Sequence, residues 1–145
     1  MSAPKPHPFA GVTMPPASAT LGWRLIACDA KGGMISVGFE GKPEFANPAG
    51  VIQGGILGAM IDDAMSALVI AHTRAERFPS TIDLHVHYLR PVRPGPVRVD
   101  ARISEKGRSV IFLEAELFES RGKRAARATA SAALIEGVMK KTTES

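Results

Sequence analysis

The sequence contains a single cysteine, Cys28, so no disulfide can form within the chain. This scarcity favours a reducing compartment, because disulfides persist mainly in oxidising ones. No stretch reaches the roughly 20 consecutive apolar residues of a membrane span. The proline-rich start, MSAPKPHPFAGVTMPP, lacks the apolar run of a secretory signal. We therefore expect a cytoplasmic protein that makes no contact with a membrane.

Aromatic residues are also scarce, with one Trp, one Tyr and six Phe. The net charge of +4 and the pI of about 9.6 would by themselves suit a nucleic-acid-binding protein. However, the aromatics are not interleaved with a basic stripe, as they are where bases stack on a protein. Nucleic acid is therefore disfavoured as a partner. A small ligand that carries phosphate groups accounts for the same excess of positive charge.

The rest of the composition is that of one globular domain, with 45% hydrophobic and 22% charged residues. Residues 1–20 are proline-rich and predict a mostly extended arm, residues 21–137 predict the folded domain, and residues 138–145 predict a frayed tail. Only residues 54–72 form a convincing long helix. Strands are expected before and after it in the segments WRLIACDA, MISVGFE, STIDLHVHYLR, PVRVDARISEK, SVIFLEAELFES and KRAARATASAALIE.

This order of elements predicts an α+β fold in which one helix covers an antiparallel sheet of about six strands. The separators Pro94-Gly95, Lys106-Gly107 and Arg121-Gly122 have turn chemistry, and such short connections join antiparallel neighbours. The edges of the sheet and one face of the helix would remain uncovered. A second subunit is therefore expected on structural grounds.

The two faces of the expected helix differ in kind. The face that should pack on the sheet is apolar and consists of Leu57, Met60, Ile61, Ala64, Ala67 and Leu68. The opposite face is small and polar, with Gly58, Ala59, Asp62 and Ser66, and with Asp63 at its margin. A solvated face would carry long charged side chains instead. Small residues around a carboxylate leave room for a ligand, so this face predicts a functional site.

The helix starts with Gly54-Gly55, where backbone N–H groups lack an intrahelical partner and lie at the positive end of the helix dipole. This arrangement suits an anion, or a carbonyl oxygen that develops negative charge. Asp62 lies about 12 Å further along the helix axis. Both groups must lie about 3 Å from the reacting atoms, which one helix cannot achieve. Two antiparallel helices related by a two-fold axis can, so we predict a composite site in a homodimer.

One set of residues lies before the helix, along it and in the strand that follows, and the spacings between its members form a pattern: Asn47, Gly50, Gln53-Gly54-Gly55, Asp62, Thr81, Asp83, Tyr88, Pro91 and Gly95. On these residues the sequence resembles the hotdog-fold acyl-CoA thioesterases, in the branch that includes phenylacetyl-CoA and 4-hydroxybenzoyl-CoA thioesterases. The resemblance runs from about Gly22 to Glu136. It implies a hotdog fold, in which the sheet wraps one long central helix, and an acyl-CoA substrate. It also implies a homodimer as the minimal unit, paired into a homotetramer, with no metal and no cofactor.

The resemblance also implies roles for individual residues. Asp62 would be the nucleophile toward the thioester carbonyl, or the base that activates water. The Gly54 N–H would polarise the carbonyl oxygen, Asn47 would orient water or substrate, and Thr81 would assist Asp62. Gln53 completes the catalytic set and stands where most of this branch has histidine. Residues implied to bind the substrate or its CoA part are Gly55, Ser66, Asp83, Tyr88, Arg90, Arg93, Lys106, Gly107, Arg108 and Ser109.

Three assignments within this set remain open from the residues alone. Asp63 is a rival to Asp62 as the catalytic carboxylate, and Ser80 is a rival to Thr81 as the helper hydroxyl. Asn47-Pro48 could also be turn chemistry and nothing more.

The residues also leave other functions open. Asp83, His85 and His87 share one strand face and could bind a metal ion, but no Cys/His cluster elsewhere supports this. Glutamine hydrogen-bonds but cannot become charged, so Gln53 leaves open a non-catalytic acyl-CoA-binding regulator. Hydratases and dehydratases of related folds pair an Asp with a His a few residues further on. His72 lies ten positions after Asp62 and near the helix end, so this function is disfavoured.

Overall fold

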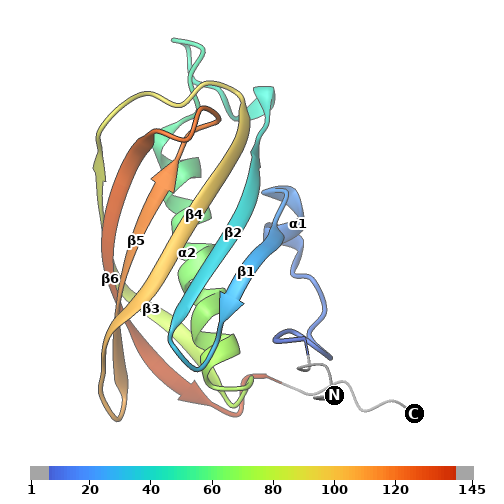
Figure 1. Ribbon diagram of the computed structural model, residues 1–145, viewed down its shortest axis with the longest axis vertical. Helices are drawn as coiled ribbons and strands as arrows, with labels where there is room; N and C mark the ends of the chain where they lie inside the picture. Colours follow the sequence, from blue (N-terminus) through green and yellow to red (C-terminus); the bar gives the residue numbers. More distant parts are fainter. Residues whose placement is uncertain (1–6, 140–145) are drawn as a thin grey trace, which may run out of the picture.

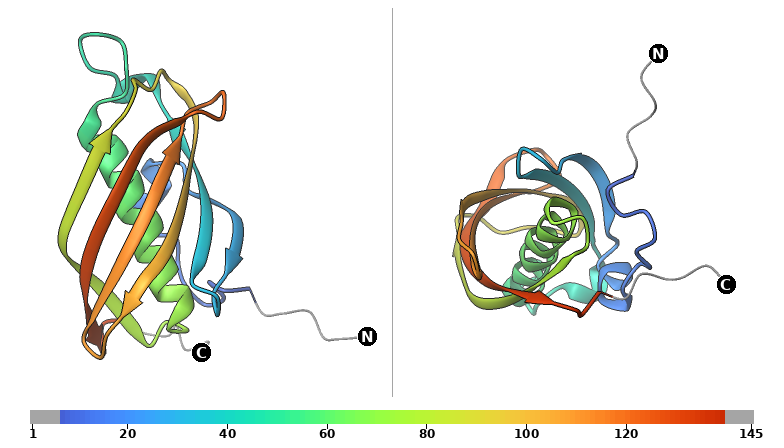
Figure 2. Two further views of the ribbon diagram at one scale, coloured as in Figure 1. Left: turned by 60° about the vertical axis from the view of Figure 1, so that its left-hand side comes forward. Right: turned by 90° about the horizontal axis from the view of Figure 1, so that it is seen from below.

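A six-stranded antiparallel sheet curls around one long helix in the computed structural model, which describes residues 7–139 (Figure 1). The helices are α1 (Pro16–Thr20) and α2 (Gly54–His72), with a 3₁₀ turn at Pro43–Phe45. The strands are β1 (Arg24–Asp29), β2 (Met34–Gly41), β3 (Arg77–Tyr88), β4 (Gly95–Lys106), β5 (Val110–Phe118) and β6 (Arg124–Glu136). Seen from below, the sheet wraps around α2 (Figure 2, right). The predicted α+β architecture is confirmed.

Helix α2 forms the centre of the core, with the bounds expected from the sequence. Every residue of the predicted sheet-facing side is buried: Leu57, Met60, Ile61, Ala64, Ala67 and Leu68. Met65 is buried as well, and so belongs to the core. Burial of a side chain such as Leu68 contributes about 1.5–3 kcal/mol. Packing of this face therefore holds the helix in place, although it begins with two glycines.

By length and composition, α2 is also long and apolar enough to cross a membrane, with a mean hydropathy of 1.5. The expectation that no segment reaches this limit was therefore wrong. In the structure, half of this segment is buried inside the protein, and the sheet surrounds it (Figure 2). The apolar composition of α2 thus follows from its place in the core.

The connection after β3 differs from the expectation. The turn residues Pro94-Gly95 predict an antiparallel hairpin, but β3 pairs with β6 and β4 pairs with β2 and β5. Residues 89–94 instead cross the end of the sheet, where Val92 is buried and its carbonyl accepts the Ile52 N–H. Turn chemistry marks where the chain reverses, but not which strands pair. The other two predicted turns do join antiparallel neighbours.

Strands β1 and β3 form the two edges of the sheet. Much of β3 is exposed, and its apolar side chains include Ile82, 60% exposed, and Tyr88, 50% exposed. An exposed edge strand of this kind is a template for pairing with another chain. The second subunit remains a prediction, and β3 is the edge that suits it.

A β-bulge at Ile82 determines which β3 side chains face α2. Residues 81 and 83 pair with consecutive residues of β6, so Ile82 is the extra residue. In a regular strand, Thr81 and Leu84 would point to opposite faces. The bulge shifts this alternation by one, which allows both side chains to face the helix.

The N-terminal arm is not extended throughout, because residues 16–20 form α1. Pro16 lies in its first turn, where the missing N–H costs no hydrogen bond. Further toward the N-terminus, the Phe9 ring meets the Trp23 ring edge-on, with 5.3 Å between the ring centroids. The predicted frayed tail lies mostly outside the described residues, which end at Met139.

Candidate active site

The small, polar face of α2 borders an open groove beside β3. The groove has a volume of about 510 Å³ and is lined by Gly55, Gly58, Ala59, Asp62, Leu84, Val86 and Tyr88. The side of the groove formed by α2 is the small, polar face on which the sequence predicted a functional site. Ser66, assigned to the same face, does not line the groove.

Asp62 provides the carboxylate of this groove. The Thr81 hydroxyl donates a hydrogen bond to Asp62 Oδ1 over 2.8 Å. The bulge at Ile82 makes this contact possible, since it places Thr81 on the helix side of β3. Ser80 makes no hydrogen bond to Asp62 within residues 7–139. Of the two candidate hydroxyls, the structure therefore brings Thr81 to the carboxylate.

Asp63 points away from the groove and toward the N-terminal arm. The Ser18 hydroxyl of α1 donates to Asp63 Oδ1 over 3.0 Å. Burial raises the pKa of Asp63 above its ordinary value; the Ser18 hydrogen bond opposes this shift and the nearby Asp62 charge adds to it. Asp63 does not line the groove, so Asp62 is the carboxylate that can meet a ligand there.

The start of α2 carries backbone N–H groups without acceptors. Gln53 provides no side-chain cap, and the Gly54 and Gly55 N–H groups donate to nothing within the described part of the chain. Such N–H groups at the positive end of a helix bind anions or oxygens that gain negative charge. This end of α2 is therefore ready to receive a carbonyl oxygen.

The two glycines differ in how closely another molecule can approach. A Cβ added to Gly54 would lie 3.3 Å from the Tyr88 ring, whereas nothing lies within 4 Å of one added to Gly55. The Tyr88 hydroxyl also donates to the Gly54 carbonyl over 2.6 Å. Tyr88, predicted to bind the substrate, thus anchors the helix start in the described chain. The expected room for a ligand lies at Gly55.

Asn47 shapes the loop that leads to α2. Its side-chain Oδ1 accepts the N–H groups of Ala49, over 2.9 Å, and of Val51, over 3.3 Å. The Asn47 oxygen therefore holds a turn, while its amide NH₂ makes no hydrogen bond within residues 7–139. The exposed Gln53 side chain makes none within this range either. Both amides are free to contact a substrate.

The predicted CoA-binding residues fall at opposite ends of one subunit. Arg90 and Arg93 lie in the β3–β4 connection, at the end of the sheet where α2 begins (Figure 1). Lys106, Gly107, Arg108 and Ser109 lie in the β4–β5 hairpin at the other end. Strand β4 separates the two groups by 12 residues, or about 40 Å of extended chain. One subunit does not bring them together.

Asp83 has a structural partner rather than an open position. Its Oδ1 accepts the Ser131 N–H over 2.9 Å, next to the bulge in β3. The hydrogen bonds from Ser131 lower the pKa of Asp83. Asp83 thus supports the bulge that places Thr81.

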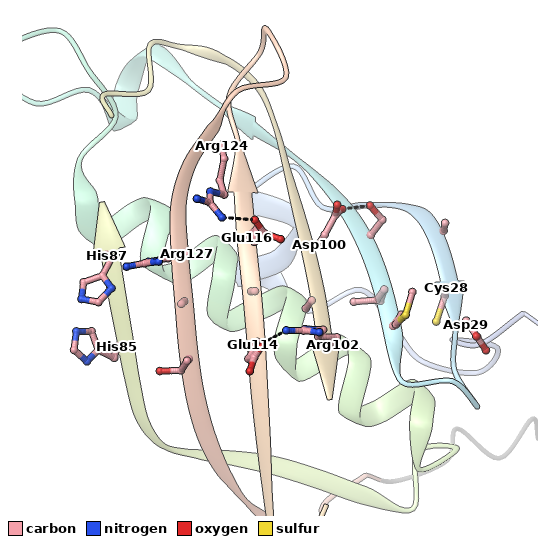
Figure 3. A pocket seen from close by; sticks show the side chains of 18 residues that line it. Cys28, Asp29, His85, His87, Asp100, Arg102, Glu114, Glu116, Arg124 and Arg127 are labelled. Atoms are coloured by element: carbon pink, nitrogen blue, oxygen red, sulfur yellow. Dashed lines mark hydrogen bonds and ion pairs between the residues drawn. The ribbon is translucent and has the colours of Figure 1, made fainter. Parts of the chain in front are cut away.

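A second hollow, of about 840 Å³, lies on the face of the sheet turned away from α2 (Figure 3). The sequence did not predict it. Paired charges cross its floor, including Arg124 and Glu116 at 3.0 Å. The His85 and His87 rings lie at its rim with centroids 4.6 Å apart. Asp83 is engaged by Ser131, and no group of three metal-binding side chains exists among residues 7–139.

The contact between Thr81 and Asp62 leads to a direct prediction. Thr81→Val removes the hydroxyl but keeps the branched shape, so Asp62 loses a charge-assisted hydrogen bond. We expect the turnover that depends on Asp62 to fall roughly 10-fold or more. Ser80→Ala is the matched control and should retain the wild-type rate. Equal losses in both variants would show that the hydroxyl at position 81 has no special role.

One central helix wrapped by a six-stranded antiparallel sheet, with a carboxylate groove beside the edge strand, defines a protein of the hotdog fold. The model of the thioesterase superfamily matches residues 49–126, more than half of the chain. The chain therefore belongs to the thioesterase superfamily.

Individual relatives agree with this assignment. A phenylacetic acid degradation-related protein of Ralstonia eutropha, described as a proposed thioesterase, is 36% identical with a TM-score of 0.80; the match covers 86% of this chain and 95% of that one. A Saccharolobus solfataricus protein whose name proposes an esterase is 32% identical over 92 residues, which span 62% of this chain and 64% of that relative. The protein smu.793 of Streptococcus mutans, solved with acetyl-CoA bound, shares the fold at 17% identity; the match covers 79% of this chain and 89% of that one, with a TM-score of 0.70.

Proposed function

We propose that this protein is an acyl-CoA thioesterase, which hydrolyses an acyl-CoA to a carboxylic acid and free CoA. The observation that carries the proposal is the groove in which Asp62, held by Thr81, shares one helix face with an uncapped helix start. A carboxylate supplies the base or nucleophile for hydrolysis, and free N–H groups stabilise the oxyanion that forms. Packing alone requires neither feature.

The two groups would act together in a dimer. Asp62 lies eight residues beyond Gly54, about 12 Å along the axis, so one subunit cannot present both to the same carbonyl. Pairing of two exposed β3 edges about a two-fold axis would place the two copies of α2 antiparallel. Asp62 of one subunit would then meet the helix start of the other. The open groove, lined by both Gly55 and Asp62, supports this arrangement because it leaves the helix face accessible to a second subunit.

In this site, the chemistry would proceed through a tetrahedral oxyanion. Asp62 takes a proton from water as the water oxygen attacks the thioester carbon, or its carboxylate attacks directly and water cleaves the resulting anhydride. In both routes the carbonyl electrons move to the oxygen, which the helix-start N–H groups stabilise. Collapse of the oxyanion breaks the C–S bond, before water cleaves any anhydride, and the CoA thiolate leaves and takes up the proton released from water.

The basic residues would hold the CoA part of the substrate. The guanidinium groups of Arg90, Arg93 and Arg108 and the Lys106 amine make no ion pairs within residues 7–139, and Arg and Lys are suited to phosphate. An antiparallel dimer would bring the β4–β5 hairpin of one subunit toward the β3–β4 connection of the other. CoA would then bind across the subunit boundary. The acetyl-CoA in the S. mutans protein of this fold is consistent with such a ligand.

Release of free thiol from short, medium, long and aryl acyl-CoAs tests the proposal. Turnover of at least one class by the purified protein supports it and identifies the acyl group. The second candidate function is a non-catalytic acyl-CoA-binding regulator, motivated by Gln53 at the position of a family histidine. Saturable binding of acyl-CoA without thiol release from any ester would favour that regulator and contradict the thioesterase.

A further inference from the structure

Ser18 and Asp63, which do not line the groove, form a hydrogen bond with each other inside the protein. Within residues 7–139, Ser18 is the only buried polar residue, at 4% exposed. The only buried side-chain oxygen or nitrogen without a partner in the same range is Asp63 Oδ2. Ser18 donates to the other oxygen of this carboxyl, Oδ1, over 3.0 Å. The bond compensates the burial of the Ser18 hydroxyl and of Asp63 Oδ1, whereas burial of Oδ2 without a partner carries a free-energy cost.

The bond joins the N-terminal helix to the catalytic helix. Ser18 is the only buried residue of α1, and its hydrogen bond to Asp63 is a polar contact between α1 and α2. Ser18 also lies outside residues 49–126, the part that the superfamily model matches. The family match alone therefore does not include this contact.

Asp62 and Asp63 are consecutive, and each receives a hydroxyl hydrogen bond from a different element. Thr81 of β3 holds Asp62, and Ser18 of α1 holds Asp63. Consecutive side chains point about 100° apart around a helix. A rotation or shift of this turn would strain both bonds, so the turn is held from two sides.

We infer that Ser18 and Asp63 are positioning residues, whose hydrogen bond fixes the turn of α2 that carries Asp62 relative to the groove. The inference rests on the proposed hydrolysis at Asp62. It makes the N-terminal arm part of the support of the active site.

The contribution of Asp63 to stability depends on whether its carboxyl is protonated. Burial, the largest influence, raises the pKa of Asp63, and the Asp62 charge adds to this, while the Ser18 bond lowers it. Helix α1, with the sequence PASAT, brings no charged group to face it. A carboxyl with a raised folded-state pKa stabilises the fold below its unfolded-state pKa, and this stabilisation is lost as the pH rises through the folded-state value. Burial therefore favours a neutral Asp63 in the folded protein, whereas the Ser18 hydrogen bond taken alone favours the ionised carboxylate.

Four variants test the inference. Ser18→Ala and Asp63→Ala remove the bond, and we expect kcat to fall roughly 10-fold with a smaller change in KM, because Asp62 is displaced. Ser18→Thr and Asp63→Asn keep a donor and an acceptor, so each should recover most of the lost turnover. Asp63→Asn should also remove the loss of stability with rising pH, measured by urea unfolding across the pH range.

Different results separate the possible failures. Wild-type kcat in Ser18→Ala would show that α1 does not position the turn and would overturn the inference. A loss in Asp63→Asn as large as that in Asp62→Asn would overturn it too, since Asp63 would then act as a charge. If the wild-type protein hydrolyses no ester, the proposed function fails. The pH dependence of unfolding then still decides the contact, which is refuted if Ser18→Ala and Asp63→Asn leave that dependence unchanged.

Discussion

Asp62→Asn is expected to lower turnover of the preferred acyl-CoA by about 10²–10⁴-fold, the usual contribution of a general base. The amide still accepts the Thr81 hydrogen bond, so the groove should keep its shape. It cannot take a proton from water or attack the thioester, however. Free-thiol release measures the loss, and urea unfolding shows whether the fold is intact.

The neighbouring residue provides the matched control for this variant. Asp63→Asn makes the same chemical change one position further along α2, at a carboxyl that faces Ser18 instead of the groove. Its turnover should therefore remain far above that of Asp62→Asn. Retained hydrolysis in Asp62→Asn would contradict the assignment of Asp62.

Gly54→Pro should cause the second large loss, through the other half of the site. Proline is well suited to the first position of a helix and removes only the backbone N–H there. Gln53, the preceding residue, has φ −58° and ψ 136°, which is compatible with a following proline. Loss of one oxyanion donor typically lowers kcat by about 10²–10³-fold.

Gly54→Ala is the control, because both substitutions add a Cβ that meets the Tyr88 ring at 3.3 Å. Alanine keeps the N–H, so most of the turnover should remain. Equal activity of the two variants would show that the Gly54 N–H is not the donor. The same pair of substitutions at Gly55, where a Cβ meets nothing within 4 Å, would then test the neighbouring N–H.

Local patterns made part of this structure predictable from the sequence. The bounds of α2 and its buried face follow from apolar spacing, which depends only on residues a few positions apart. The small face with Asp62 was predictable for the same reason, and it does border the groove. The motif from Asn47 to Asp62 also indicated the family to which the chain belongs.

Features that depend on distant contacts were not predictable in this way. The bulge at Ile82 is set by the pairing of β3 with β6, which no turn residue indicates. Alternation alone therefore could not choose between Ser80 and Thr81. Ser18 and Asp63 are 45 positions apart, so their bond depends on how the arm folds back over α2. The prolines of the arm indicated an extended chain, so α1 was not predicted.

A subunit-mixing experiment tests most directly whether each site combines two subunits. Asp62→Asn and Gly54→Pro chains, each nearly inactive alone, are mixed in equal amounts under conditions that exchange subunits, and thiol release is measured. In a hybrid dimer, one site receives both lesions and the other receives none. A composite site predicts recovery of about one quarter of wild-type activity, because half of the randomly formed dimers are hybrids with one intact site of two. If the mixture stays as inactive as its parents although hybrids have formed, each site lies within one chain and the composite site is contradicted.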